Sequence, residues 1–298
     1  MPRTTRTVLV PSLSLAVALT LGALPAASAT PSTALPVSHS ALSAARPSLP
    51  EPQVEAPVPD VLDVDLAEGT QDHASGRTVT VYGPQAPVST DEALGRPVMG
   101  FDGSNAIGYD YLDGYEATAQ QVTIECTFRF DAPLPGGSEE TTGNFCGAKE
   151  AGGYSLTVYG STLKMMVNVT NEEKKNRYFG PGVDIRAGQW YHAVGVWDGN
   201  DLILYLNGRK VAQTSTWAGT ITAPKPATRK LFIGADTSST GDPQFNGTVS
   251  LAHAGVFSRA VSAQEVEALY AQAFASRTTD QVSFTASSPA TGAHLEAP

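Results

Sequence analysis

Three acidic residues near the start of the patterned part of the chain have a spacing that could support acid–base chemistry. Asp63, Asp65 and Glu68 stand in the segment DVDLAE, and on an extended strand Asp63 and Asp65 share a face. Two carboxyl groups facing one sugar are what glycoside hydrolysis requires. The segment lies at the N-terminal edge of the patterned region, however, and AEGT after it indicates a turn. Acidic residues that keep an edge strand soluble are therefore the favoured interpretation.

Metal-dependent hydrolysis of phosphate esters would need a cluster of Asp, His and Asn ligands that holds two ions close together. The one Gly-Asp pair, Gly241-Asp242, has no histidine close to it in the sequence. The five histidines are scattered along the chain at His39, His73, His192, His253 and His294. We therefore expect this chain to carry no catalytic residues and not to be an enzyme by itself.

The first 29 residues have the pattern of a secretory signal peptide. Arg3 and Arg6 precede an apolar run, and Ala27-Ser28-Ala29 predicts cleavage after Ala29. We expect an exported, extracellular protein without membrane insertion, because no other segment approaches about 20 apolar residues. The full chain has a net charge of -10, and the 17 basic and 29 acidic residues after the signal peptide give -12. Such acidity argues against nucleic-acid and anionic-membrane partners.

Export also bears on the two cysteines, Cys126 and Cys146. An oxidising compartment favours one disulfide between them over a metal or nucleophile role. On the chain-entropy account, closing a loop of about 20 residues contributes roughly 3 kcal/mol.

Composition divides the rest of the chain. Residues 30–59 are rich in Pro, Ala and Ser and predict a disordered linker. Residues 60–275 alternate short apolar runs with Gly, Asn, Asp and Pro clusters, which predicts one all-β domain, a two-sheet antiparallel sandwich. Residues 276–298 are too few to fold alone, so they are either the start of a truncated domain or a disordered tail.

The elements that must position any site can be predicted individually. In QVTIECTFRFD, Val122, Ile124, Cys126, Phe128 and Phe130 share one face of a strand. YSLTVYG and LKMMVNV predict a hairpin that turns at Gly160-Ser161, and Asn207-Gly208 predicts a type I′ turn between two further strands. The segment SAQEVEALYAQAF is the one convincing helix, with a capping box of Ser262 and Glu265.

These segments carry a resemblance. GQWYHAVGVWDGNDLILYLNGRKVA, LFIGAD and FNGTVSLAHAGVFSRAVSAQEVEALY resemble, in this order, the laminin-G-like jelly roll of the concanavalin A-like lectin/glucanase superfamily. VMGFDGSNAIGY is similar to the first core strand of that family. The resemblance covers about residues 60–275 and implies a jelly roll, on which lectins, accessory domains and some glucanases are built. DVDLAE is similar to the Glu-x-Asp-x-x-Glu strand of laminarinase-type glucanases, but it has Asp63 at the nucleophile position, with a shorter reach.

A narrower resemblance concerns the setting of the domain. TIECTFRFDAPLP with NFCGAKEAGGYSLTVYG is similar to laminin-G-like modules at the N-terminus of secreted actinobacterial calcineurin-like metallophosphoesterases. VSFTASSPATGAHLEAP resembles the first strand of the immunoglobulin-like segment that would follow. This resemblance implies a fragment whose catalytic domain lies beyond residue 298 and contacts the module within one chain.

The resemblance also assigns faces to the aromatic stretch that begins at Trp190. It implies that Trp190 and His192 point into the core, so that Tyr191 and Trp197 point to the opposite face. A polysaccharide or glycan could bind there, because sugar sites combine an aromatic platform with carboxylate, amide or guanidinium groups. The expected ligand-binding residues are Tyr191, Trp197, Tyr205, Tyr159, Glu125, Arg129 and Asn168. The alternative is that the helix over 262–274 or a loop covers these aromatics.

Many jelly rolls of this superfamily bind one structural calcium ion through loop carboxylates and carbonyls. The expected ligands are Asp236 and Asp242 in GADTSSTGDPQFNG, with Asp102. The sequence thus favours a secreted, non-catalytic glycan-binding module, ahead of a structural accessory domain without a glycan ligand and, third, a glucanase.

Overall fold

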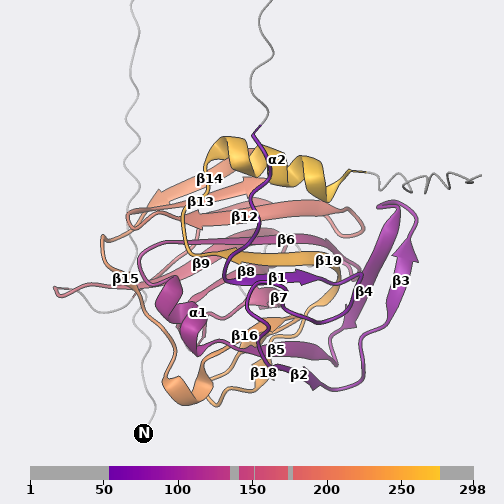
Figure 1. The fold of residues 1–298 in the computed structure, drawn as a ribbon, viewed down its shortest axis with the longest axis horizontal. Helices are drawn as coiled ribbons and strands as arrows, with labels where there is room; N and C mark the ends of the chain where they lie inside the picture. Colours follow the sequence, from indigo (N-terminus) through magenta and orange to yellow (C-terminus); the bar gives the residue numbers. More distant parts are fainter. Residues whose placement is uncertain (1–53, 135–140, 151, 174–176, 276–298) are drawn as a thin grey trace, which may run out of the picture. The chain divides into compact units, whose positions relative to one another are not determined.

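The computed structural model describes residues 54–134, 141–150, 152–173 and 177–275. Two antiparallel sheets pack face to face and enclose the main core (Figure 1). The predicted all-β sandwich is therefore confirmed. The predicted signal peptide, residues 30–53 of the predicted linker and the tail from residue 276 lie outside the described residues.

Sheet A has eight strands in the order β14-β13-β12-β6-β19-β4-β3, and β1 also pairs with β19. Its strands are β1 (Leu62–Asp65), β3 (Val88–Asp91), β4 (Arg96–Asp102), β6 (Val122–Phe130), β12 (Tyr191–Trp197), β13 (Asp201–Leu206), β14 (Arg209–Ser215) and β19 (Thr248–Phe257). We call the side of each sheet that faces the other sheet its inner face, and the opposite side its outer face.

Sheet B has nine strands in the order β10-β9-β8-β7-β16-β5-β2, and β11 and β15 also pair with β9. Its strands are β2 (Val79–Tyr82), β5 (Ala106–Asp110), β7 (Thr141–Gly147), β8 (Tyr154–Tyr159), β9 (Thr162–Thr170), β10 (Arg177–Phe179), β11 (Gly182–Asp184), β15 (Thr220–Ile221) and β16 (Lys230–Ile233). A separate pair is formed by β17 (Asp236–Thr237) and β18 (Pro243–Gln244).

The alternation predicted for β6 is present, since Val122, Ile124, Cys126, Phe128 and Phe130 all belong to the main core. The hairpin of β8 and β9 turns at Gly160-Ser161 as predicted. Asn207 and Gly208 have φ angles of 50° and 76°, the left-handed pair that a type I′ turn requires. VMGFDGSNAIGY, by contrast, is two strands, β4 and β5, which lie in different sheets.

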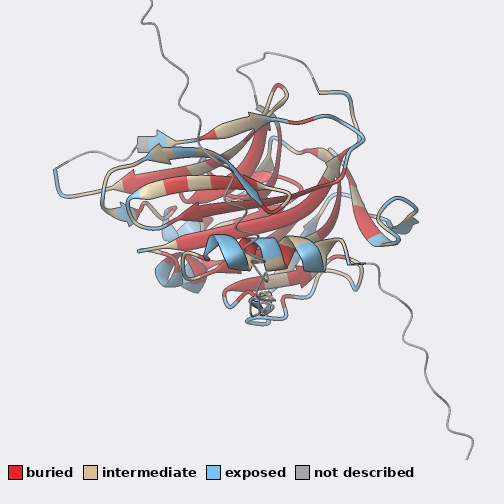
Figure 2. Ribbon diagram, turned by 90° about the horizontal axis from the view of Figure 1, so that it is seen from above, coloured by how far each residue is buried: buried red, intermediate tan, exposed pale blue. Residues whose placement is uncertain are grey.

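Helix α2 (Ala263–Ala273) begins at the predicted capping box, where Ser262 Oγ accepts from Glu265 N and Glu265 accepts from Ser262 N. Val266 and Leu269 pack with Val194 and Val196 on the outer face of sheet A. Figure 2 shows that the strands are largely buried and that α2 carries exposed residues on the side that faces away from the sheet. Two short helices were not expected: α1 (Leu112–Ala117) and the 3-10 helix η1 (Pro226–Thr228).

The end of the predicted linker belongs to the folded domain. Ala56 packs against the cluster beneath α2, and Pro59 is buried. Figure 1 shows this segment crossing sheet A near α2 before it reaches β1. In the described part of the chain, no helix combines the length and the apolar character that crossing a bilayer requires.

Candidate functional site: a charged pocket on sheet A

A pocket of about 440 Å³ opens on the outer face of sheet A. Four adjacent strands, β12, β6, β19 and β1, form its floor, and Arg96 of β4 contributes to its wall. Pro57–Pro59 and the C-terminal end of α2 complete the walls. The floor is unusual for a sheet surface because its central side chains are ionisable: Glu125 and His192 are almost fully buried, and the side chains of His253 and Asp63 are 24% and 20% exposed.

These side chains form a zigzag across the four strands. His192 Nε2 donates to Glu125 Oε2 at 2.9 Å, and His253 Nδ1 donates to Glu125 Oε1 at 2.9 Å. His253 Nε2 then donates to Asp63 Oδ1 at 2.8 Å. In the strand register, His192 and His253 both flank Thr127, and Gly255 lies between Glu125 and Asp63. The chain of hydrogen bonds therefore crosses back and forth between two neighbouring rows of the sheet.

A β-bulge in β19 places His253 in this chain. Val249 and Leu251 point to the inner face, so strict alternation would turn residue 253 inward as well. The register shifts between Leu251 and His253, and Ala252 packs on the outer face with Trp190. The extra residue reverses the alternation, so His253 points outward beside Glu125.

Gly255 leaves room for the carboxylate. A Cβ atom at this position would lie 2.7 Å from Pro59 Cγ and 2.9 Å from Glu125 Oε1. Any side chain here would therefore push either the pocket wall or Glu125 out of place.

The charges in the zigzag stabilise one another. Burial alone would raise the pKa of Glu125, but the positive charge of His253 and the hydrogen bonds from both histidines lower it. Burial alone would lower the pKa of His253, but the negative charge of Glu125 and the hydrogen bonds to Asp63 and Glu125 raise it to about 10. The floor therefore holds an ionised Glu125 beside a protonated His253 at neutral pH.

His192 supplies one polar atom that the zigzag leaves unused. Since Glu125 is ionised and can only accept, Nε2 of His192 carries the proton of that hydrogen bond. Nδ1 of His192 is buried and has no hydrogen-bond partner among the residues that the structure describes. In a neutral ring this atom is an acceptor at the floor of the pocket.

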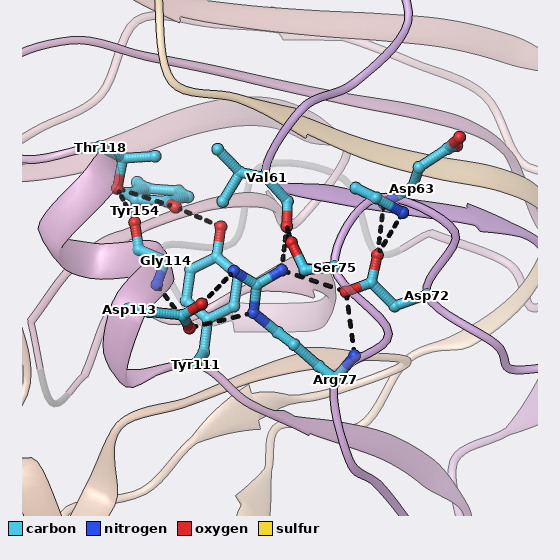
Figure 3. A network of polar contacts seen from close by, with 11 residues as sticks. Val61, Asp63, Asp72, Ser75, Arg77, Tyr111, Asp113, Gly114, Thr118 and Tyr154 are labelled. Atoms are coloured by element: carbon cyan, nitrogen blue, oxygen red, sulfur yellow. Dashed lines mark hydrogen bonds and ion pairs between the residues drawn. The ribbon is translucent and has the colours of Figure 1, made fainter.

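A second polar network holds β1 in place below the pocket (Figure 3). Asp72 Oδ1 accepts from Asp63 N at 3.1 Å, and Asp72 Oδ2 pairs with Arg77 at 3.0 Å. Arg77 also donates to Val61 O and, through two nitrogens, to Asp113, and it lies over the Tyr111 ring. These contacts fix the backbone of residue 63, and with it the carboxylate that His253 binds.

The rim of the pocket carries further charged pairs. Arg96 Nη2 donates to Asp65 Oδ1 at 3.1 Å, and His73 lies 3.7 Å from Glu68. The acidic residues of DVDLAE thus do face one pocket, but Asp63 and Asp65 are each held by a cationic partner. As expected, their strand β1 has a neighbour on one side only.

The face assignment for β12 is wrong. Tyr191 and Trp197 belong to the main core, and Trp197 is fully buried. Gly195 on the same face approaches Met165 of sheet B, since a Cβ there would lie 2.6 Å from Met165 Sδ. His192, expected in the core, lines the pocket, and Trp190 packs on the outer face with Val98 and Ala252. The physical reason is that α2 covers the outer face, so all residues of β12 are buried and alternation carries no signal.

The other expected ligand-binding residues do not form one surface. Glu125 lines the pocket, whereas Tyr205 is covered in the cluster beneath α2, as the alternative interpretation held. Arg129 lies over the Trp190 ring and pairs with Asp91 and Asp131. Tyr159 and Asn168 belong to sheet B, on its outer face.

The expected calcium ligands do not come together. Asp236 is buried, and its carboxylate contacts both the backbone N and the ammonium of Lys149. Asp102 and Asp242 are exposed, and their carboxylates accept hydrogen bonds from the hydroxyl groups of Ser104 and Thr240, respectively. Within the described ranges, no three His, Cys, Asp or Glu residues are grouped to hold a metal ion. The three carboxylates are therefore engaged separately, and the structural calcium ion remains a prediction.

The two cysteines lie in opposite sheets, Cys126 in β6 and Cys146 in β7, and both side chains are buried in the core as free thiols. Burial raises the pKa of Cys126, and the neighbouring Cys146 thiol, which is within hydrogen-bonding contact, raises it further. The disulfide remains a prediction.

Comparison with known proteins agrees with this fold. The model of the family Laminin_G_3, described as the concanavalin A-like lectin/glucanases superfamily, matches residues 103–267, more than half of the chain. No curated protein matches the sequence.

Several solved structures are similar in fold. The receptor binding domain of botulinum neurotoxin D has a TM-score of 0.54 and 11% identity, over 71% of this chain and 52% of that one. The binding domain of botulinum neurotoxin serotype G has a TM-score of 0.53 and 14% identity, over 71% and 50%. The binding domain of Paraclostridial Mosquitocidal Protein 1 has a TM-score of 0.52 and 12% identity, over 71% and 52%. This chain spans about half the length of each, and such low identities indicate a shared fold alone.

Proposed function

Because this chain belongs to the concanavalin A-like lectin/glucanases superfamily, we propose that it is a non-catalytic carbohydrate-binding module whose ligand enters the pocket on sheet A. The observation that carries the proposal is the pocket itself. It has the volume of a small-ligand site and a floor of ionisable groups that are oriented by hydrogen bonds to one another.

The rim offers what a sugar hydroxyl requires. Glu68 can accept hydrogen bonds from hydroxyl groups, and Asp65 and Arg96, which also bond to each other, can accept and donate further ones. Hydrogen bonds to ionised groups are about twice as strong as those between neutral groups. Val58 and Leu269 add apolar surface for the C–H groups of the ring. A sugar therefore matches both the charged and the apolar side chains of the pocket, through its hydroxyl groups and its C–H groups.

The charge of the pocket favours a neutral ligand over an anionic one. Asp63, Asp65, Glu68 and Glu125 stand against the cations Arg96 and His253. A phosphate or polyanion would meet net negative charge here, in a chain whose net charge is -10.

A glycoside hydrolase is the enzymatic alternative, since the carboxyl groups of DVDLAE line the same pocket. A general acid must hold a proton that it can give to the leaving group. Glu125 is held ionised, and Asp63 and Asp65 are occupied by His253 and Arg96. These pairings favour binding over catalysis. Release of reducing sugar that is abolished by Glu68→Gln would reverse this conclusion.

The setting of the module is part of the proposal. The signal-peptide pattern supports export, and the resemblance to modules of secreted metallophosphoesterases supports a role as the N-terminal accessory region of a larger extracellular hydrolase. The similar solved domains are receptor-binding and binding domains of toxins, which supports a binding role for this fold.

The proposal is tested by titrating the full chain with a panel of xylo-, cello-, manno- and laminari-oligosaccharides. We expect at least one neutral oligosaccharide to bind, and the double variant Asp65→Asn/Glu68→Gln to weaken it by about tenfold or more, because it loses charge-assisted hydrogen bonds. The matched control, Glu92→Gln/Asp198→Asn, removes the same charge from exposed acids outside the pocket. A silent panel would favour the structural accessory domain without a glycan ligand.

A further inference from the structure

The outer face of sheet B carries buried polar atoms that no described residue satisfies. Among the described residues, no hydrogen-bond partner is found for either amide atom of Asn144 in β7, for Oγ of Ser155 in β8 or for Oδ1 of Asn168 in β9. Each of these residues is at most 2% exposed. Leaving a buried polar group without a partner costs about 1–3 kcal/mol, so such a group calls for a missing partner.

Aromatic rings surround this part of the sheet. Phe245 and Tyr178 are 45% and 38% exposed, which makes them the two most exposed aromatic side chains among the described residues. The ammonium of Lys149 lies 5.0 Å from the Phe245 ring centroid and 5.5 Å from that of Tyr159. It also pairs with Glu150 and, at 3.5 Å, with Asp236. Two carboxylates thus pair with the buried Lys149, and the Lys164 ammonium lies 4.9 Å from the Tyr159 ring centroid.

Phe245 has a backbone conformation that a bulky residue rarely adopts. Its φ angle is 49°, in the left-handed region. Its carbonyl accepts from Asn144 N at 2.9 Å, so the strained turn is tied to the residue whose amide is unpaired. Strain of this kind persists where the surroundings impose it, and it gathers at binding sites.

We infer that this face is a second carbohydrate site, in which a neutral pyranose ring stacks on Phe245 and its hydroxyl groups bond to Asn144 and Asp236. The inference rests on the proposed function for the class of ligand, but its residues are separate from the pocket on sheet A. An aromatic face with adjacent amide and carboxylate groups suits a sugar. Lys149 itself does not favour an anion, because it is already paired with two carboxylates.

Occupation of the site requires one local movement. The Lys149 ammonium lies near both rings and beside Asp236 Oδ2, so the sugar must displace this buried side chain toward Glu150. Glu150 is 44% exposed at its side chain and keeps the ion pair near solvent.

The test uses Phe245→Gly and Phe245→Tyr in the full chain, titrated with the same oligosaccharide panel. Glycine accepts a φ of 49° without strain, so Phe245→Gly should leave the melting temperature equal or higher while it weakens binding by at least about tenfold. Phe245→Tyr keeps the ring and should retain binding. A ring that served only to stabilise the fold would give the reverse, a lower melting temperature with binding unchanged.

The two sites can fail separately. If binding is lost in Asp65→Asn/Glu68→Gln but unchanged in Phe245→Gly, the inference on sheet B is overturned and the proposed function stands. Loss in Phe245→Gly alone supports the inference and overturns the pocket as the site. If no oligosaccharide of the panel binds, the proposed function and this inference are both overturned.

Discussion

The outer faces of the two sheets bury polar side chains in different ways. On sheet A, Glu125 and His192 are 3% and 1% exposed, and both are bonded in the zigzag, although Nδ1 of His192 has no partner among the described residues. On sheet B, Asn144 and Ser155 are as deeply buried, but no described residue bonds to Oγ of Ser155 or to either amide atom of Asn144. A largely satisfied network can serve as a rigid frame, whereas an unsatisfied one awaits water or a ligand. The difference suggests that the bonded side chains of sheet A maintain the shape of its pocket. The unpaired side chains of sheet B are available to bond to water or a ligand.

The largest expected effect comes from breaking the satisfied network. Glu125→Gln keeps the shape of the side chain but leaves His253 without its central anion, so we expect a loss of about 3 kcal/mol or more in the free energy of unfolding. Urea denaturation measures this loss, with the exposed Glu92→Gln as control. A loss below about 1 kcal/mol would mean that the zigzag is no better than a surface ion pair.

A cross-link between the two sheets would join the regions under comparison. Cys126 is next to Glu125 in β6, and Cys146 is two residues from Asn144 in β7. If the exported chain is oxidised, the disulfide should add roughly 3 kcal/mol to the free energy of unfolding, which reduction removes. Intact mass after alkylation decides whether the bond exists, because a chain with two alkylated cysteines has no disulfide. Cys126→Ala/Cys146→Ala should be insensitive to reductant.

The pH dependence of stability tests the charge state of His253. The pKa of His253 is raised in the folded protein from 6.5 to about 10, so the folded state binds more protons than the unfolded state between these values. The stabilisation is complete below pH 6.5 and is lost as the pH rises toward 10, by a few kcal/mol at most. Unfolding in urea at successive pH values measures this slope, and His253→Gln should flatten it. An equal slope in the variant would contradict the protonated state.

The smallest expected effect lies on sheet B. Asn144→Leu removes two unpaired polar atoms at similar volume, so the free energy of unfolding should stay within about 1 kcal/mol or rise. Thermal and urea unfolding of the free protein measure it. A loss of more than about 2 kcal/mol would show that the amide has partners in solution, and the contrast between the two faces would then disappear.

Much of the fold could be predicted from local patterns. The alternation of β6, the turn at Asn207-Gly208 and the capping box of α2 are all decided by neighbouring residues, and each prediction is confirmed. The faces of β12 could not be predicted, because α2 buries the outer side of a strand whose inner side is core. The alternation of apolar and polar residues distinguishes the two faces of a strand only when one face is exposed to solvent.

The site was less accessible to sequence reasoning. Asp63, Glu125, His192 and His253 come from four strands whose spatial order, β12-β6-β19-β1, is not the order of the chain. The bulge at Ala252 reverses the direction of His253, and no turn residue or glycine marks it. The one available signal was the presence of ionisable residues inside otherwise apolar strands, as in TIECTF and LAHAGV.

The most direct test of the central claim is a two-dimensional NMR titration of the full chain with the oligosaccharide that binds best in the panel. The account predicts ligand-dependent shifts of the His192 and His253 ring signals and of the Asp65 and Glu68 amides around the pocket on sheet A. Saturable binding that leaves all four of these residues unshifted would contradict it.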